Sequence, residues 1–321
     1  MATTRDDDPA DTVASAQGHS DGLMVRAGHL TVVRSGTLQG MPALQYAIDI
    51  CPLGDLSDPR AILRLARAAE ESGWDGLSMW DSLGLSMGST AADLFVVLAG
   101  VAVQTRRLLL ITSIVALARR RPQLVVQAAG TLDRLSDGRL ILGLGAGEDQ
   151  PDFEAFGDPY DRATRIGLMD EGLAIVDEGL RGAALDHEGP LLTARGAVLG
   201  PSPVQQPRPP IWLGAMKPGG LRRAARWEGW IGVAMSEDGS GMSLSPDAFA
   251  DLVGIATAER QALGRAGEPF DVAVLGLSDP GRAPLSRAFG EAGATWWLES
   301  LSPMRGSVDD LEAIVRSGPP R

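Results

Sequence analysis

The sequence has few of the residue types that bind catalytic metals or form disulfides. It contains three histidines and one cysteine in 321 residues. A single cysteine, Cys51, cannot form an internal disulfide, so a reducing cytoplasm is the expected location. Two histidines, His19 and His29, fall in a polar N-terminal segment, which leaves His187 in the rest of the chain. A metal-dependent hydrolase usually needs more histidine ligands than that, so no metal site is predicted.

Positive charge and long apolar runs are also scarce. The formal net charge is −12, and Lys217 is the only lysine among the 29 basic residues. An acidic chain of this kind is not expected to bind nucleic acid or an anionic membrane surface. No apolar run approaches the roughly 20 residues that a membrane-spanning helix needs.

The first 43 residues differ in composition from the remainder. Residues 1–43 are polar, acidic at their start and without hydrophobic periodicity. They lack a basic start followed by an apolar stretch, which argues against a secretory signal. We predict a disordered extension over 1–43 and one folded domain over 44–321.

Within 44–321, short apolar runs alternate with segments of helical periodicity. The predicted strands are 46–50, 76–80, 108–111, 140–144, 211–214, 230–234, 270–277 and 295–299. The predicted helices are 59–73, 94–101, 122–135, 161–180, 221–227, 246–263, 285–291 and 308–316. Strand then helix, eight times, predicts an α/β (β/α)8 barrel, with a doubly wound open sheet as the alternative. The Gly- and Pro-rich residues 182–209 are interpreted as an insertion, with room for a short hairpin.

The segment 107–148 is the most informative part of the chain. A buried strand leads through three arginines to Pro122, which suits the first turn of a helix. In this helix, Leu124, Val125, Ala128, Leu132 and Leu135 recur at helical spacing and predict one inward face. A second strand then runs into Gly145-Ala146-Gly147-Glu148.

The glycines of this second strand do not complete a dinucleotide-binding fingerprint. After Gly143 and Gly145 that motif needs a third glycine, and Glu148 holds its place. Missing side chains would instead let a flat cofactor ring approach the backbone closely. A tight strand-to-loop exit without a ligand is the alternative interpretation.

In a barrel, the catalytic residues lie at the carboxyl ends of the strands. The residues that the predicted strands bring to that face are Cys51, Trp80, Asp81, Ser113, Gly145 to Glu148, Ala215 to Gly219, Ser236, Glu237 and Glu299.

With these strand ends assembled, the sequence resembles the luciferase-like monooxygenase superfamily of flavin- and deazaflavin-dependent oxidoreductases. The matching stretches are Thr112-Ser113-Ile114 with Arg120-Arg121-Pro122, residues 129–139, residues 142–148, Pro210 to Gly214, and Leu221 to Trp227. The resemblance covers residues 45 to about 316 and implies a barrel that binds reduced coenzyme F420, a deazaflavin, or FMN.

The resemblance also implies roles for individual residues. Relatives support the cofactor ring on a bulge with a non-proline cis peptide after the third strand, which falls here on Ser113-Ile114. The Gly145-Ala146-Gly147-Glu148 stretch is similar to that of deazaflavin-dependent members. Bacterial luciferases carry a phosphate-binding arginine near Ala146, which this chain lacks.

Two further loops are implicated by the same comparison. Gly214 to Gly219, which includes Ala215, Met216 and Lys217, matches the loop whose helix start receives the cofactor phosphate. A strand end followed by a helix start favours an anion, because backbone N–H groups are free there, and we expect Lys217 to add a charge. Many deazaflavin enzymes have Asp-His after the second strand, where this chain has Asp81-Ser82 following Trp80.

The sequence thus predicts an oxidoreductase that transfers hydride to, or monooxygenates, a small organic substrate. Glu148 is the expected acid or base, because a carboxyl beside an apolar ring loses hydration and its pKa rises. A loop carboxylate that caps nearby backbone is the alternative for Glu148. Asp81 is the second catalytic candidate. A non-catalytic flavin-binding barrel is the rival function, and relatives suggest a homodimer.

Overall fold

The structure is a computed structural model that describes residues 43–236, 241–278 and 285–321. Residues 1–42 of the predicted N-terminal extension lie outside these residues, as does Glu237. Eight strands form the barrel: β1 (Gln45–Ile50), β2 (Gly76–Met79), β3 (Leu109–Thr112), β5 (Leu140–Gly145), β8 (Ile211–Gly214), β9 (Gly229–Val233), β10 (Asp271–Gly276) and β11 (Trp296–Leu301).

The eight strands are parallel and close on themselves. The order of neighbours runs β3-β2-β1-β11-β10-β9-β8-β5, and a further pairing between β3 and β5 joins the two ends. Leu110 pairs with Leu140 and Ile111 with Ile141 at this junction. In an open sheet β3 and β5 would be edge strands that do not pair with each other. The (β/α)8 prediction is therefore confirmed, and the doubly wound alternative is wrong.

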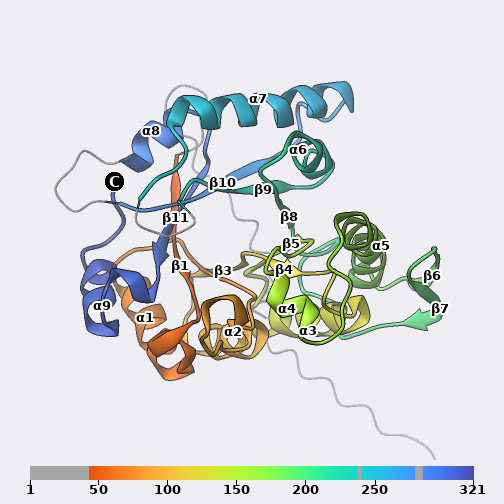
Figure 1. Ribbon diagram of the computed structural model, residues 1–321, viewed down its shortest axis with the longest axis horizontal. Coiled ribbons are helices and arrows are strands. Elements are labelled where there is room, and N and C mark those ends of the chain that lie inside the picture. The colour runs from red at the N-terminus through yellow and green to blue at the C-terminus, as the bar shows by residue number, and fades with distance from the viewer. Residues whose placement is uncertain (1–42, 237–240, 279–284) are drawn as a thin grey trace, which may run out of the picture.

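Helices cover the outside of the barrel (Figure 1). They are α1 (Pro59–Glu71), α2 (Leu94–Gln104), α3 (Pro122–Leu135), α4 (Gln150–Glu154), α5 (Arg162–Leu180), α6 (Pro218–Ala224), α7 (Pro246–Ala262), α8 (Leu285–Glu291) and α9 (Val308–Arg316). Local signals begin several of them: Asp58 caps α1 by accepting a hydrogen bond from the Arg60 amide at 2.9 Å, and Pro59 follows it. Short 3₁₀ turns, η1 (Gly54–Ser57), η2 (Leu85–Met87) and η3 (Pro303–Arg305), lie in the loops.

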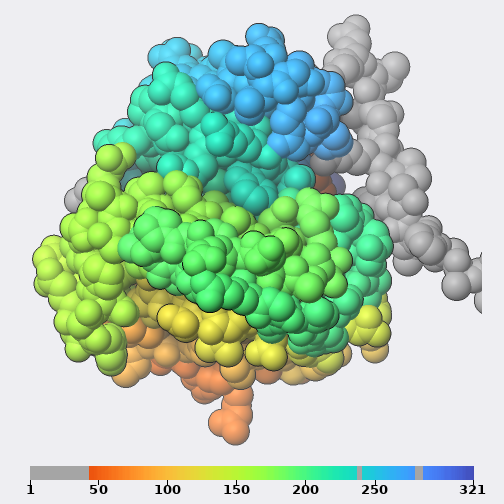
Figure 2. Space-filling view, turned by 90° about the vertical axis from the view of Figure 1, so that its right-hand side faces the viewer, coloured from red at the N-terminus to blue at the C-terminus, as the bar shows by residue number. Residues whose placement is uncertain are grey.

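The predicted insertion contains a hairpin. β6 (Ala184–Glu188) and β7 (Thr193–Val198) pair antiparallel and lie beyond α5, outside the barrel (Figure 1). Seen from that side, this green segment lies across the front of the molecule (Figure 2). The chain after β7 is fixed to α3, because the carboxylate of Asp133 accepts hydrogen bonds from the amides of Val204 at 2.7 Å and Gln205 at 3.0 Å.

Alternating side chains of the strands form two cores. One set packs outward against the helices and includes Ile48 and Ile50. The other fills the barrel interior and includes Ala47, Ile111, Ile141, Trp212 and Trp296. The two indoles meet edge to face with ring centroids 5.8 Å apart. Because side chains alternate along a strand, the odd-numbered residues of β1 face the interior.

The prediction for the inward face of α3 is partly wrong. Val125 and Leu132 are buried as expected, but Leu124 is 59% exposed and Leu135 is 44% exposed. Val126 and Ala129 complete the buried stripe instead. Helix α3 packs against both α2 and α5. These contacts bury a face of α3 that lies to one side of Leu124 and Leu135.

Candidate active site

The barrel mouth, meaning the carboxyl ends of the eight strands and the loops that follow them, begins with a bulge after β3. The Ser113-Ile114 peptide bond is cis, which confirms the predicted backbone. Beyond it, the short strand β4 (Val115–Ala116) resumes pairing with β5 through Val115 and Leu144. Ser113 and Ile114 are half-buried, and Ile114 packs on the interior core from above together with Trp80.

The two glycines at the ends of β5 and β8 make room for Ile114. A Cβ on Gly145 would lie 2.0 Å from Cδ1 of Ile114, and one on Gly214 would lie 2.9 Å from the same atom. The space above Gly145 is therefore filled by a side chain of the protein. At Gly145, part of the glycine-lined floor predicted from the sequence, Ile114 occupies the space, and the two glycines allow its side chain to lie deep in the mouth.

The loop after β5 is held from its outer side. Gly147 has a φ of +76°, and a Cβ there would lie 2.8 Å from the Phe153 ring. The carbonyl of Gly147 accepts a hydrogen bond from Arg165, and the carbonyl of Glu148 accepts one from the Tyr160 hydroxyl at 2.6 Å. The Glu148 backbone is thus fixed while the residue itself is exposed.

Asp81 is held by two arginines. Its carboxylate lies 2.7 Å from Nη2 of Arg120 and 3.1 Å from Nη2 of Arg119, and its side chain is 2% exposed. It also accepts a hydrogen bond at 3.0 Å from the amide of Ala116 in β4. Burial alone would raise the pKa of Asp81, but the hydrogen bond and charge of Arg120, with the charge of Arg119, hold the pKa below its ordinary value. This carboxylate is suited to fixing the β3–β4 bulge, and its geometry does not favour proton transfer.

The loop after β2 is tied to α4 through acidic groups. Asp152 is buried and accepts hydrogen bonds from the amides of Leu83 at 2.7 Å and Leu85 at 3.2 Å, and from the Ser82 hydroxyl at 3.3 Å. Burial raises the pKa of the neighbouring Asp149, and the charges of Asp152 and Glu148 add to the rise. Ser82, which stands where many deazaflavin enzymes have histidine, thus lies beside the carboxyl groups of Asp152 and Asp149.

The loop after β8 presents backbone and one cation. The carbonyl of Ala215 accepts a hydrogen bond from the Trp230 indole at 2.7 Å, and the Met216 sulfur accepts one from the Val233 amide at 3.1 Å. Lys217 is exposed at the N-cap of α6, and its side chain makes no capping hydrogen bond. Gly219 is exposed, and a Cβ there would meet no atom within 4 Å.

Asp49, which was not predicted from the sequence, also belongs to this site. It lies in β1, fully buried, and its carboxylate accepts hydrogen bonds from the Ser113 hydroxyl at 2.6 Å and the Trp80 indole at 2.5 Å. A signal was present in the sequence: Asp49 is the one charged residue of an otherwise apolar strand, Tyr46-Ala47-Ile48-Asp49-Ile50. A buried strand retains a carboxylate only where other groups satisfy it.

Two residues that the sequence placed at the strand ends, Glu299 and Cys51, do not contribute a reactive group to the barrel mouth. Glu299 faces the outer side of β11, where it pairs with Arg305 at 2.6 Å and accepts from the Trp297 indole at 2.8 Å. Burial and the charge of Asp49 raise the pKa of the Cys51 thiol to about 12, so Cys51 stays a neutral, buried side chain.

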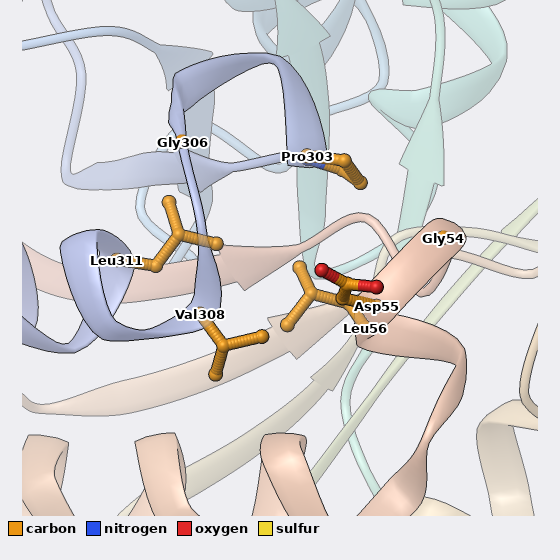
Figure 3. Close-up of a pocket in the computed structure, with 7 residues that line it drawn as sticks. All are labelled: Gly54, Asp55, Leu56, Pro303, Gly306, Val308 and Leu311. Carbon is orange, nitrogen blue, oxygen red and sulfur yellow. The ribbon is translucent and has the colours of Figure 1, made fainter.

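A small cavity of about 210 Å³ lies between η1, η3 and α9, in the loops that follow β1 and β11 (Figure 3). Its lining includes Leu56, Pro303 and Leu311 and none of the mouth residues described above. In the ranges that the structure describes, no group of three or more His, Cys, Asp or Glu side chains could hold a metal ion. No helix of the described residues is long and apolar enough to cross a membrane.

Comparison with known proteins agrees with this geometry. Residues 27–277 match the family model of the luciferase-like monooxygenases. The chain belongs to the luciferase-like monooxygenase family. This match extends over most of the barrel and includes β1 through β10, so the resemblance found in the sequence is confirmed.

Solved structures with the same fold use two kinds of cofactor. The coenzyme F420-dependent tetrahydromethanopterin reductase of Methanopyrus kandleri superposes with a TM-score of 0.70 at 17% identity, over 86% of this chain and 98% of that one. An F420-dependent secondary alcohol dehydrogenase, solved with an F420–acetone adduct, gives 0.70 at 16%, over 85% and 98%. The oxygenating constituent of 3,6-diketocamphane monooxygenase from Pseudomonas putida, solved with FMN, gives 0.59 at 17%, over 73% and 67%.

Proposed function

We propose that this protein is an oxidoreductase that binds reduced coenzyme F420 or FMN at the barrel mouth and acts on a small organic substrate. The observation that carries the proposal is the apolar surface formed by half-buried Ile114 and Trp80 beside the Ser113-Ile114 cis peptide. Small-molecule sites are mostly apolar with a few placed polar groups, and this surface has Ser113 and Asp49 directly beneath it.

The residues present fit a flat ring carrying a phosphate tail. Ile114 and Trp80 would contact the ring, and the backbone of Gly145, Ala146 and Gly147 would border its edge. The tail would extend to the loop from Gly214 to Gly219, where Lys217 and the amide of Gly219 at the start of α6 favour an anion. When bound, the cofactor supplies the redox chemistry, and the protein orients it and manages protons.

Between the two cofactors we propose the deazaflavin. The Gly145-Ala146-Gly147-Glu148 stretch supports it, as does the absence from the sequence of an arginine near Ala146 that would bind the FMN phosphate. Ser82 argues against the deazaflavin, because many deazaflavin enzymes have a histidine at this position. Glu148 is the proposed acid or base, because its backbone is fixed at the edge of the mouth while its side chain remains accessible to a substrate.

Replacing Lys217 by alanine is expected to weaken cofactor binding about tenfold at low salt, because a charge-assisted contact to phosphate is lost. The Kd would be measured by fluorescence titration at two salt concentrations, since added salt screens an exposed cation. Arg222→Ala is the matched control. Arg222 is an exposed cation of the same helix but lies in its last turn. Equal affinity of Lys217→Ala and wild type at low salt would show that Lys217 does not contact the phosphate.

Turnover separates an enzyme from a non-catalytic flavin-binding barrel. The protein would be loaded with each reduced cofactor and mixed with a panel of ketones, aldehydes and imines. Cofactor oxidation that depends on both protein and acceptor supports the oxidoreductase. Tight binding without such oxidation across the panel, in the absence and presence of oxygen, would favour the non-catalytic function.

A further inference from the structure

Asp49 is a buried carboxyl without a positive partner. Its exposed fraction is 0%, and no arginine, lysine or histidine of the described residues pairs with it. The other fully buried carboxyl of the barrel strands, Glu299, has Arg305 as its partner. Asp49 faces the barrel interior directly below the mouth and is satisfied by neutral donors alone.

The hydrogen bonds of Asp49 join it to two residues of the proposed cofactor surface. Its Oδ1 accepts from the hydroxyl of Ser113 at 2.6 Å, and its Oδ2 accepts from Nε1 of Trp80 at 2.5 Å. The hydroxyl of Ser78 lies 2.6 Å from that of Ser113 and completes a chain of three groups. Ser78 is fully buried, whereas Ser113 is partly exposed, so the chain opens to the mouth at Ser113.

The donors and acceptors of this chain depend on one proton. When Asp49 is ionised, the Ser113 hydroxyl must donate to it, and Ser113 offers only its lone pairs to other groups. When Asp49 is protonated, the proton needs an acceptor, and an indole N–H can only donate. The hydroxyl that lies closest to the carboxyl is Ser113 Oγ, 2.6 Å from Oδ1 of Asp49, so Ser113 accepts this proton and its own proton is released to point into the mouth or to Ser78.

We propose that Asp49 is a positioning residue whose protonation state decides whether Ser113 offers a hydrogen-bond donor or only an acceptor to a ligand in the barrel mouth. The inference rests on the proposed function in one respect: the ligand is a flavin or deazaflavin ring, whose carbonyl oxygens are hydrogen-bond acceptors. Protonated Asp49 favours such a ligand, and binding takes up a proton.

Burial and hydrogen bonding act in opposite directions on the pKa of Asp49. Burial raises the pKa of Asp49 above its ordinary value, although hydrogen bonds from Ser113, Ser78 and Trp80 oppose the rise. Ser300 on β11 stands opposite Asp49 in register, and its buried hydroxyl has no hydrogen-bond partner among the described residues. A ring laid over Ser113 would exclude water and raise the pKa further.

The other titratable groups near Asp49 are few. Along β1 the neighbour is Cys51, a thiol that stays neutral, and Asp149 approaches Cys51 from the loop after β5. From β2 and β3, Asp49 meets Ser78, Trp80 and Ser113, which carry no charge. The rim residue Asp149 also has a pKa raised by burial, and it is therefore the group from which Asp49 must be distinguished.

The binding test uses oxidised FMN and oxidised coenzyme F420, each titrated between about pH 5 and about pH 9. Wild type is expected to bind about tenfold more tightly at the acid end, since the hydrogen bond from Ser113 to the ligand is replaced by a mismatched buried contact as Asp49 ionises. Asp49→Asn places an amide donor against Ser113 and imitates the protonated acid, so it should keep the tight affinity at every pH. Ser113→Ala should bind weakly at every pH, and Asp149→Asn should titrate as wild type does.

A second measurement needs no ligand. The emission of Trp80, isolated by comparison with Trp80→Phe, should change as Asp49 ionises in the free protein. Asp49→Asn should abolish this transition. Ser113→Ala should move its midpoint to higher pH, because a hydrogen bond that lowers the pKa is removed.

The outcomes distinguish this inference from the proposed function. Affinity that does not vary with pH, or an Asp49→Asn variant that titrates like wild type, would overturn the inference while leaving cofactor binding in place. If neither cofactor binds, the proposed function fails. The pH-dependent change in Trp80 emission then tests the inference without a ligand. If this change is absent, or if Ser113→Ala does not move its midpoint, Asp49 is not coupled to Ser113.

Discussion

Replacing Glu148 by glutamine is expected to slow turnover about a hundredfold or more and to leave cofactor binding unchanged. The amide keeps the shape of the side chain but cannot exchange a proton at working pH. The backbone of the loop should not move, because it is held by Tyr160 through the Glu148 carbonyl and by Arg165 through the Gly147 carbonyl. The measurements are single-turnover oxidation of the reduced cofactor and a binding titration.

The control for this substitution is Glu154→Gln. Glu154 is an exposed carboxylate on α4 that accepts a hydrogen bond from Gln150 at 2.7 Å, so it tests the loss of a nearby negative charge alone. Glu154→Gln should retain turnover. If Glu148→Gln is as active as wild type, Glu148 is a loop carboxylate and the proton comes from another group.

The second large effect is expected on stability, from Asp81→Asn. Removing one partner of a buried ion pair leaves the other uncompensated, and we expect a loss of about 3 kcal/mol in the free energy of unfolding. The amide can still face Arg120 but cannot neutralise Arg119 and Arg120. Urea unfolding measures the loss. A variant of unchanged stability that has lost turnover would instead support the catalytic role predicted for Asp81 from the sequence.

The pH dependence gives the same prediction an independent test. Because the folded-state pKa of Asp81 lies below its ordinary value of 3.8, its contribution to stability is present above that value and is lost as the pH falls through the folded-state pKa. Wild type should therefore lose its advantage over Asp81→Asn in acid. Asp93→Asn is the control, because Asp93 lies 3.3 Å from Arg120, is 47% exposed and keeps its helix cap as asparagine.

The barrel and its bulge could be predicted because they depend on local pattern. Buried parallel strands appear as short apolar runs, and the alternation with helices leaves one closed topology once the lengths are counted. The Ser113-Ile114 bulge followed from the resemblance of its flanking residues. The hairpin in 182–209 and the capping of α1 by Asp58 could be predicted as well, because turn and cap residues act over only a few positions.

The parts that could not be predicted depend on contacts between distant segments. Nothing near Gly145 shows that its missing side chain makes room for Ile114, 31 positions earlier in the chain. The same holds for Asp81, whose arginines follow it by more than 35 residues. Asp49 is the exception, since a charge inside an apolar strand is a visible signal whose meaning required the fold.

Anaerobic titration of the protein with each reduced cofactor, followed by admission of oxygen, tests the central claim most directly. A reduced flavin reacts with oxygen, whereas a deazaflavin essentially does not and passes on a hydride. We predict tight binding of reduced coenzyme F420, with oxidation that requires an organic acceptor and is unaffected by oxygen. Tight binding of reduced FMN with oxygen-dependent product formation would contradict the choice of deazaflavin, and binding of neither would contradict the proposed function itself.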